Sequence, residues 1–125
     1  FQATLEYIKR RFPHKQIWIV ETAYNWKGSN TLSDEEVDQL PYPQTPDGQY
    51  GFLNELRSIV EQGIGSGGGD SSTVFYWGSH CTQSKMWLNE NTTQQERNYW
   101  TEIGTRALFD EDGVALKGID GLLGK

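Results

Sequence analysis

The sequence predicts an α/β fold with a parallel sheet. Residues 16–20 and residues 73–77 are short runs rich in β-forming side chains, and a helical pattern precedes each of them. A long polar segment follows each run, so the elements come in the order helix, strand, loop, helix, strand, loop. Repeated alternation of this kind is typical of a parallel sheet with helical connections.

The first helix is predicted over residues 1–11. Its apolar positions have helical spacing at Phe1, Leu5, Ile8 and Phe12. Basic residues fill the last turn, and Pro13 ends the helix because proline cannot continue it. The pattern opens at the first residue without a cap before it, so we expect the chain to be a piece of a longer protein.

The first strand, residues 16–20 (QIWIV), is apolar after its opening glutamine. Such a run is typical of a strand in a parallel sheet that is covered on both faces. Residues 23–44 follow it and include the acidic run SDEEVD and the turn-forming PYPQTP. We expect this segment to be a long irregular loop, and long loops in compact domains are usually functional or disordered.

The second helix is predicted to begin at residues 45–47, where threonine is the N-cap and proline takes the first helical position. Its expected end is Gly63. The side chains that it should bury are Phe52, Leu53, Leu56, Ile59 and Val60. A glycine-rich connector, the second strand (TVFYW) and a long polar segment over residues 78–100 follow, and DEDG forms a turn near the end.

Charge and cysteine content exclude several classes of function. The chain has 11 Lys and Arg residues against 17 Asp and Glu residues, a net charge of −6 and no basic stripe, so no nucleic-acid partner is expected. No apolar run approaches the ~20 residues of a membrane helix, so no membrane partner is expected either. Cys81 is the only cysteine, which excludes an intrachain disulfide and a thiolate metal site.

Both predicted strands end in polar and aromatic side chains that indicate a site. In parallel α/β sheets, ligands bind beyond the carboxyl ends of the strands. The residues at or after those ends are Glu21, Tyr24, Trp26, Tyr76, Trp77 and His80. Aromatic rings stack on the apolar faces of sugars and carboxylates cleave glycosidic bonds, so this composition predicts a carbohydrate site.

Four segments carry a resemblance to a known family. The segments are IWIVETAYNW, YPQTPDGQYGFLNEL, VFYW and ALFDEDGVAL. In the same order they resemble blocks of glycoside hydrolase family 53, the endo-β-1,4-galactanases, and together they span nearly all of residues 21–116. The chain departs from the family pattern at Asn25, where the family usually has proline. It departs again at Gly78 and Ser79, where the family usually has glutamate and proline.

The resemblance implies that residues 1–125 are the C-terminal segment of a single (β/α)₈ TIM-barrel catalytic domain. The segment would hold the last two β/α units, with strands 7 and 8, and no second domain. By the same resemblance Glu21 is the nucleophile and Trp77 is the platform under the sugar next to the scissile bond. The other residues expected to contact the substrate are Tyr24, Trp26, Tyr76 and His80. The general acid/base glutamate of the family lies outside this chain, so the rest of the barrel would come from the same or another polypeptide.

The implied reaction is hydrolysis of β-1,4-galactan, a side chain of pectin, with retention of configuration. A retaining glycosidase needs two carboxyl groups about 5–5.5 Å apart, one to attack and one to protonate the leaving oxygen. Glu21 fills only the first role, so the segment alone is expected to be inactive. A polymeric substrate implies an extracellular or periplasmic enzyme. No organic cofactor is expected, and SDEEVD does not have the spacing of a standard calcium loop.

Other interpretations stay open from the residues alone. Glu21 is also interpretable as a solvated carboxylate at a strand end. Tyr24 and Trp77 are interpretable as core aromatics, and Trp26 as an anchor for its loop. His80 has no second ligand at metal-binding spacing, so no metal site is expected. The alternative function is a non-catalytic carbohydrate-binding module or repurposed barrel fragment. Two further alternatives rank below it. One is a different glycosidase of the same clan, and the other is a flavodoxin-like domain, for which the sequence has no phosphate loop.

Overall fold

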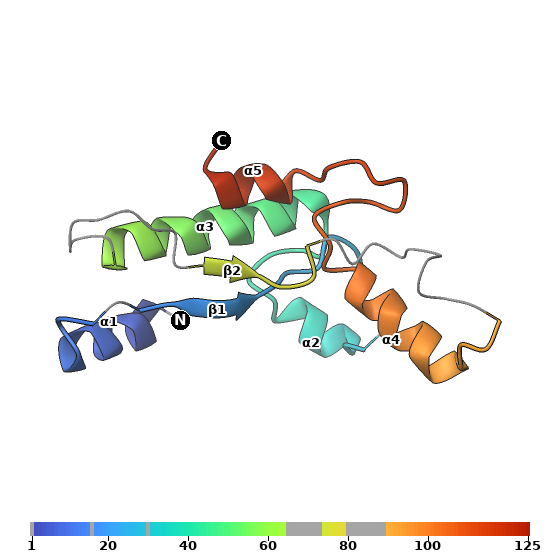
Figure 1. Ribbon diagram of the computed structural model, residues 1–125, viewed down its shortest axis with the longest axis horizontal. Coiled ribbons are helices and arrows are strands. Elements are labelled where there is room, and N and C mark those ends of the chain that lie inside the picture. Colours follow the sequence, from blue (N-terminus) through green and yellow to red (C-terminus); the bar gives the residue numbers. More distant parts are fainter. Residues whose placement is uncertain (1, 16, 30, 65–73, 80–89) are drawn as a thin grey trace.

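The computed structural model describes residues 2–15, 17–29, 31–64, 74–79 and 90–125. Its elements are α1 (Gln2–Arg11), β1 (Ile19–Thr22), α2 (Asp34–Asp38), α3 (Pro46–Ile64), β2 (Val74–Tyr76), α4 (Gln94–Gly104) and α5 (Gly118–Leu123). Figure 1 shows the two strands side by side at the centre, with α3 and α5 together on one side of them. Helices α2 and α4 lie beyond the carboxyl ends of the strands.

The two strands are parallel, as the alternation of elements predicted. Ile19 pairs with Val74 and Thr22 pairs with Tyr76, with a shift of register between the two pairs. Two residues of β1 therefore stand opposite the single residue Phe75 of β2, which is the arrangement of a β-bulge. The first strand begins and ends later than the predicted residues 16–20. Strand β1 ends at Thr22, so it includes Glu21, which was expected to follow the strand.

Helix α3 begins and ends close to its predicted bounds. The backbone N–H of Gly48 donates to the Thr45 side-chain hydroxyl at 3.1 Å, and the N–H of Gln49 donates to the Thr45 carbonyl oxygen at 2.8 Å. Its core residues are those of the expected apolar stripe, with Phe52 and Ile59 only partly buried. The buried apolar side chains of the described chain are Leu5, Tyr24, Leu53, Leu56, Val60, Ile103, Ala107 and Leu108. Helix α5, which the sequence pattern did not reveal, packs along α3.

Helices α2 and α4 correct the prediction of two irregular loops. Each begins with a capping box, in which a hydroxyl side chain and a glutamate three residues later bond to each other's backbone N–H groups. In α2 the pair is Ser33 and Glu36, so the acidic run forms a short capped helix. In α4 the pair is Thr93 and Glu96. Both signals were present in the sequence as S-x-x-E and T-x-x-E.

The expectation of a sheet covered on both faces is wrong for the described chain. Trp18, Val20 and Phe75 are 57%, 72% and 51% exposed. The rings of Trp18 and Phe75 lie 6.0 Å apart, so they form an apolar pair on this open face. The opposite face is covered, because the hydroxyl of Tyr76 reaches the side chain of Gln49 on α3. Burial on both faces needs a second layer, which the described residues do not supply.

The predicted DEDG turn is present. The N–H of Gly113 donates to the Asp110 carbonyl oxygen at 3.1 Å, and the Asp110 carboxylate accepts from the N–H of Val114 at 2.8 Å. Gly113 has a φ of 79°, a conformation that favours glycine. The glycine-rich connector from residue 65 onward lies outside the described residues, and Gly63 and Ile64 form the end of α3. Across the described part of the chain, no helix combines the length and apolar character that a membrane span requires.

Candidate active site

The candidate nucleophile lies in the bulge at the carboxyl end of β1. Val20 and Glu21 both stand opposite Phe75, and all three side chains are exposed. Ile19 and Thr22, which flank the bulge, are partly buried. Bulges turn side chains away from strict alternation and are frequent next to active sites. The extra residue therefore lets the glutamate share the open face with Phe75.

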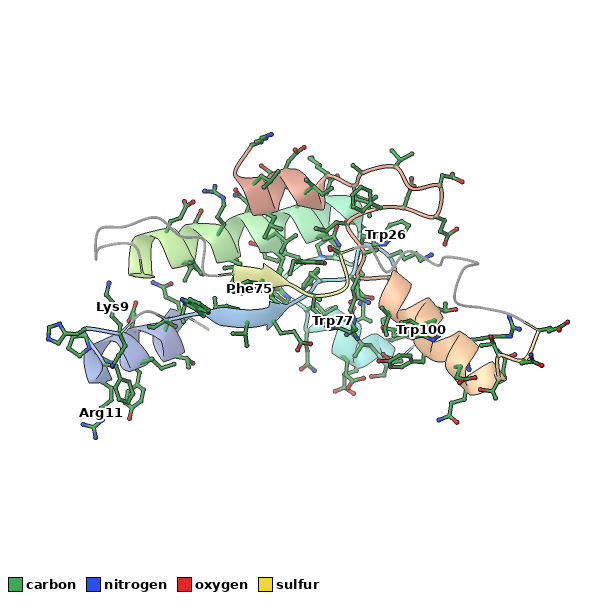
Figure 2. The ribbon with its side chains drawn as sticks, in the orientation of Figure 1. Lys9, Arg11, Trp26, Phe75, Trp77 and Trp100 are labelled. Atoms are coloured by element: carbon green, nitrogen blue, oxygen red, sulfur yellow. The ribbon has the colours of Figure 1, made fainter. Side chains whose placement is uncertain are left out.

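The backbone holds Trp77 against the residue that follows Glu21 at the carboxyl end of β1. Its N–H donates to the Thr22 carbonyl oxygen at 2.8 Å, which extends the parallel pairing past the end of β2. Its side chain is 36% exposed, and it lies at the carboxyl ends of the strands (Figure 2). Gly78 follows with a φ of 77°, so the chain turns sharply after the tryptophan. An exposed ring and an exposed carboxylate thus lie at the same end of the strand pair.

Tyr24 is a core residue in this structure. It is only 8% exposed, and its ring stacks on Phe52 with the centroids 4.5 Å apart. Its hydroxyl donates to the Tyr42 carbonyl oxygen at 2.5 Å. Burial raises the pKa of Tyr24, while the bond to the Tyr42 backbone lowers it by a smaller amount. Of the two interpretations left open by the sequence, this geometry favours the core aromatic, and the role in substrate binding stays a prediction.

Tyr76 points to the covered face. Its hydroxyl lies 2.6 Å from the Arg106 carbonyl oxygen, to which it donates, and 3.2 Å from both the Tyr24 backbone nitrogen and the Gln49 Nε2, from which it accepts. Burial raises the pKa of Tyr76, and the bonds to Tyr24 and Gln49 oppose that shift. The Tyr76 hydroxyl therefore bonds to protein groups on the covered face and does not point to the open face, and its role in substrate binding stays a prediction.

Trp26 anchors the loop after β1 to the end of α4. Its indole N–H donates to the Gly104 carbonyl oxygen at 3.0 Å, and its backbone N–H donates to the Thr105 carbonyl oxygen at 2.7 Å. The Lys27 ammonium lies 4.9 Å from the centre of the indole ring and also pairs with Glu111. This geometry favours the loop anchor over a sugar platform. His80 lies outside the described residues.

Asn25, a departure from the family pattern, belongs to the same anchor. Its side-chain amide donates to the Thr105 hydroxyl at 2.7 Å and to the Glu102 carboxylate at 3.4 Å. A proline at this position would supply neither bond. Asparagine in place of the usual proline therefore adds side-chain hydrogen bonds that hold the loop to the C-terminal end of α4.

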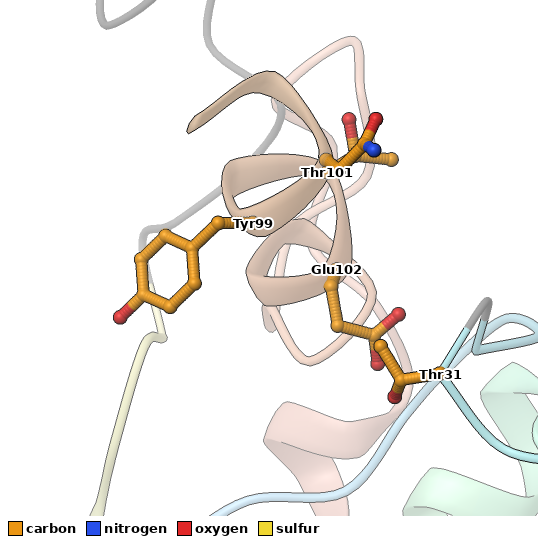
Figure 3. A pocket seen from close by; sticks show the side chains of 5 residues that line it. Thr31, Tyr99, Thr101 and Glu102 are labelled. Carbon is orange, nitrogen blue, oxygen red and sulfur yellow. The ribbon is translucent and has the colours of Figure 1, made fainter. Parts of the chain in front are cut away.

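Sequence reasoning missed Glu102, a second carboxylate near the strand ends. It is 7% exposed, accepts from the Ser29 hydroxyl at 2.6 Å and lies 3.8 Å from the Arg106 guanidinium. It lines a hollow between α4 and the loop after β1, together with Thr31 and Tyr99, and its carboxylate lies on the side of Thr31 (Figure 3). Its bonds indicate that it joins the loop to α4. No motif marks such a residue, because its role depends on segments distant in the sequence.

The described residues contain no group of three or more His, Cys, Asp or Glu side chains that is arranged to hold a metal ion. Asp34, Glu35 and Glu36 of the acidic run form the first turn of α2, where negative charge favours the helix. The pKa of Glu36 is lowered because its carboxylate accepts hydrogen bonds from the Ser33 backbone and hydroxyl. Helix capping therefore accounts for this cluster.

Comparison with known proteins identifies the family. The family model for Glycosyl hydrolase family 53 matches residues 1–122. The chain belongs to glycoside hydrolase family 53. Membership implies a (β/α)₈ barrel for the family domain, and the described chain is a small α/β part with two parallel strands joined through α3.

Two curated relatives of this family 53 chain are similar over part of their length. An uncharacterized protein in the bgaB 5′ region of Niallia circulans is 31% identical over 117 residues, which cover 86% of this chain and 28% of the relative. An arabinogalactan endo-beta-1,4-galactanase of Cellvibrio japonicus is 36% identical over 70 residues, which cover 51% of this chain and 17% of the relative. The family 53 chain thus spans less than a third of the length of either relative. No solved structure matches it significantly.

Proposed function

We propose that this chain is the C-terminal part of a family 53 barrel that hydrolyses β-1,4-galactan with retention, and that Glu21 is the nucleophile. The observation that carries the proposal is the exposed glutamate in a bulge at the carboxyl end of β1. Trp77, whose backbone N–H donates a hydrogen bond to Thr22, the residue after Glu21, would be the sugar platform. In (β/α)₈ barrels, active sites lie at this end of the strands.

The open strand face supports the placement within a barrel. In a (β/α)₈ barrel the helices cover the outer face of the sheet, and the inner faces of the strands pack against one another. Here α3 covers the face of Tyr76, while Trp18 and Phe75 lie uncovered on the other. We assign β1 and β2 to strands 7 and 8, with the open face toward the barrel interior. The remaining strands would come from the same or another polypeptide.

The proposed chemistry proceeds in two steps. The Glu21 carboxylate attacks the anomeric carbon of a galactosyl unit, the bond to the leaving oxygen breaks, and a carboxylic acid outside this chain protonates that oxygen. The result is a galactosyl ester on Glu21. Water, deprotonated by the same outside group, then attacks the anomeric carbon and releases the sugar with its original configuration. Because the chain holds only the nucleophile of this pair, we expect it to be inactive without the rest of the barrel.

The substrate is inferred from the family and from the galactanase of Cellvibrio japonicus. β-1,4-Galactan is the proposed polymer, and an enzyme acting on it would work outside the cytoplasm, in the periplasm or the medium. No organic cofactor is part of the proposed mechanism, because both steps use carboxyl groups and water.

A non-catalytic carbohydrate-binding module is the second candidate, and one observation favours it. Gly78, which stands where the family usually has glutamate, has a φ of 77°, a conformation that a glutamate would adopt only with strain. The backbone after β2 is therefore shaped for glycine. A loop that has lost a carboxylate beside the sugar platform is consistent with binding that no longer leads to cleavage.

The test is hydrolysis of β-1,4-galactan by the full-length protein, with arabinan and β-mannan as control polymers. Glu21→Gln keeps the size of the side chain and removes the attacking charge, so we expect it to lose orders of magnitude in rate while remaining folded. Cleavage of a control polymer in preference to galactan would overturn the substrate. Wild-type protein that binds galactan without cleaving it would establish the binding module instead.

A further inference from the structure

A buried glutamine joins three parts of the chain just behind the candidate site. Gln49, in the first turns of α3, is fully buried. Its side-chain nitrogen donates to the Tyr24 carbonyl oxygen and to the Ala107 carbonyl oxygen, both at 2.9 Å. One side chain therefore binds the segment after β1 to the segment after α4. These two donated bonds favour one arrangement, because a displacement would leave the buried amide nitrogen without its acceptors. The side-chain oxygen of Gln49 is buried without a hydrogen-bond partner among the described residues.

The Tyr76 hydroxyl completes this cluster from β2. A phenol has one proton to donate and can accept two hydrogen bonds. The proton goes to the Arg106 carbonyl oxygen at 2.6 Å, and the oxygen accepts from the Tyr24 N–H at 3.2 Å. The Gln49 nitrogen also lies 3.2 Å from the hydroxyl, and because its two protons have shorter bonds to carbonyl oxygens, this contact shares one of those protons. We call the Tyr76 hydroxyl and the Gln49 side-chain amide the polar hub.

The polar hub is linked to the candidate site by very short lengths of chain. Tyr24, whose backbone N–H and C=O both bond to the hub, comes three residues after Glu21. Trp77 directly follows Tyr76, and its own N–H bonds to the Thr22 carbonyl oxygen. The two strand ends that carry the glutamate and the tryptophan are therefore fixed to each other from behind.

We propose that Tyr76 and Gln49 are positioning residues, which set the Glu21 carboxylate against the Trp77 ring from the covered face of the sheet. This role rests on the proposed function of Glu21 as the nucleophile. Covalent attack needs reacting atoms held in a narrow geometry, and a displacement of about 1 Å costs ~100-fold in rate. Bulged backbone, as in β1, has fewer ladder hydrogen bonds to hold it, so side-chain support from the second strand takes their place.

Tyr76→Phe in the full-length protein is the main test, because it removes one hydroxyl and keeps the ring. Tyr42→Phe is the matched control, since the Tyr42 hydroxyl donates at 2.7 Å to the exposed Glu55 and not to the hub. Gln49→Met is a second variant that keeps an unbranched side chain and removes both donors. The probe is a 2-deoxy-2-fluoro-galactobiosyl fluoride, which forms a slowly hydrolysed ester with the nucleophile of a retaining enzyme. Its maximal rate of labelling and its binding constant are measured separately.

We expect Tyr76→Phe and Gln49→Met to lower the maximal labelling rate about tenfold or more while the binding constant changes by less than about threefold. Tyr42→Phe should match the wild type in both. The amplitude of labelling reports the folded fraction, so a loss of stability alone would lower the amplitude and leave the rate per folded molecule unchanged. That result would overturn the positioning role and leave the proposed function standing. Wild-type protein that is neither labelled nor active on galactan would instead overturn the proposed function.

Discussion

The backbone N–H of Trp77 donates to the carbonyl oxygen of Thr22 at 2.8 Å, and this bond joins the residue after one strand to the last residue of the other. It brings the backbone of Trp77 next to the residue that follows Glu21. An exposed carboxylate and an exposed indole thereby lie at the carboxyl ends of two neighbouring parallel strands. This is the end of the sheet at which barrel enzymes place their catalytic groups.

Removing the indole ring tests the sugar platform. We expect Trp77→Ala to lower kcat/KM on galactan by at least about tenfold, because stacking on the sugar face is lost, a change equivalent to ~1.4 kcal/mol. Trp77→Phe keeps an aromatic face and should retain part of the activity. Steady-state kinetics on galactan of defined length separates the two variants. Equal activity of Trp77→Ala and wild type would contradict the assignment.

The close approach of Pro43 to α3 predicts a position where only glycine fits. A Cβ added at Gly48 would lie 1.8 Å from the Pro43 carbonyl oxygen, whereas one added at Gly28 meets nothing within 4 Å. Gly48→Ala should therefore destabilise the full-length protein by about 1–3 kcal/mol through overpacking. Gly28→Ala, the matched control, should change the free energy of unfolding by less than about 0.5 kcal/mol. Denaturant unfolding measures both, and a similar effect of the two variants would be inconsistent with the contact.

The capping box at the start of α4 predicts a second effect on stability. The Thr93 hydroxyl accepts from the Glu96 N–H at 3.2 Å, so Thr93→Ala should cost about 0.5–2 kcal/mol. Thr93→Ser keeps the hydroxyl and should stay close to wild type. Amide hydrogen exchange of residues 94–104 reads out this helix directly. Unchanged protection in Thr93→Ala would show that the cap does not contribute.

The same cap predicts a dependence on pH. The pKa of Glu96 is lowered, because its carboxylate accepts hydrogen bonds from the Thr93 backbone and hydroxyl. A lowered pKa in the folded state means that this carboxylate stabilises α4 above its ordinary pKa, and that the contribution is lost as the pH falls through the lowered value. The α4 amides should therefore be better protected from exchange in the wild type than in Glu96→Gln. This difference in protection should be greatest at neutral pH and shrink in acid. A difference that grew in acid would have the wrong sign.

The sequence predicted best what local patterns determine. Helix α3 was predicted from its capping threonine, its first-position proline and its apolar stripe, and the parallel pairing followed from the order of elements. The bulge in β1 was not predictable, because it depends on the register with β2. Helix α4 was missed although Thr93 and Glu96 carried a recognisable capping signal, since the polar composition of residues 78–100 outweighed it.

The hydrogen bonds of Gln49 and Tyr76 behind the site could not be predicted from the sequence for a different reason. Gln49 bonds to residues 25 and 58 positions away along the chain, and nothing in its own neighbourhood marks it as a junction. Tyr76 was predicted as a substrate contact from its place at a strand end. Which face of a strand a side chain takes depends on the residues that pair with it, and here the tyrosine takes the face toward α3.

The most direct measurement is to identify the residue that forms the covalent intermediate. The full-length protein is labelled with the 2-fluoro galactobiosyl probe, digested, and sequenced by mass spectrometry. We predict a single ester on Glu21, and no labelling of Glu21→Gln under the same conditions. An ester on another carboxylate, such as Glu102, or an active wild type that forms no ester, would contradict the assignment of Glu21 as the nucleophile.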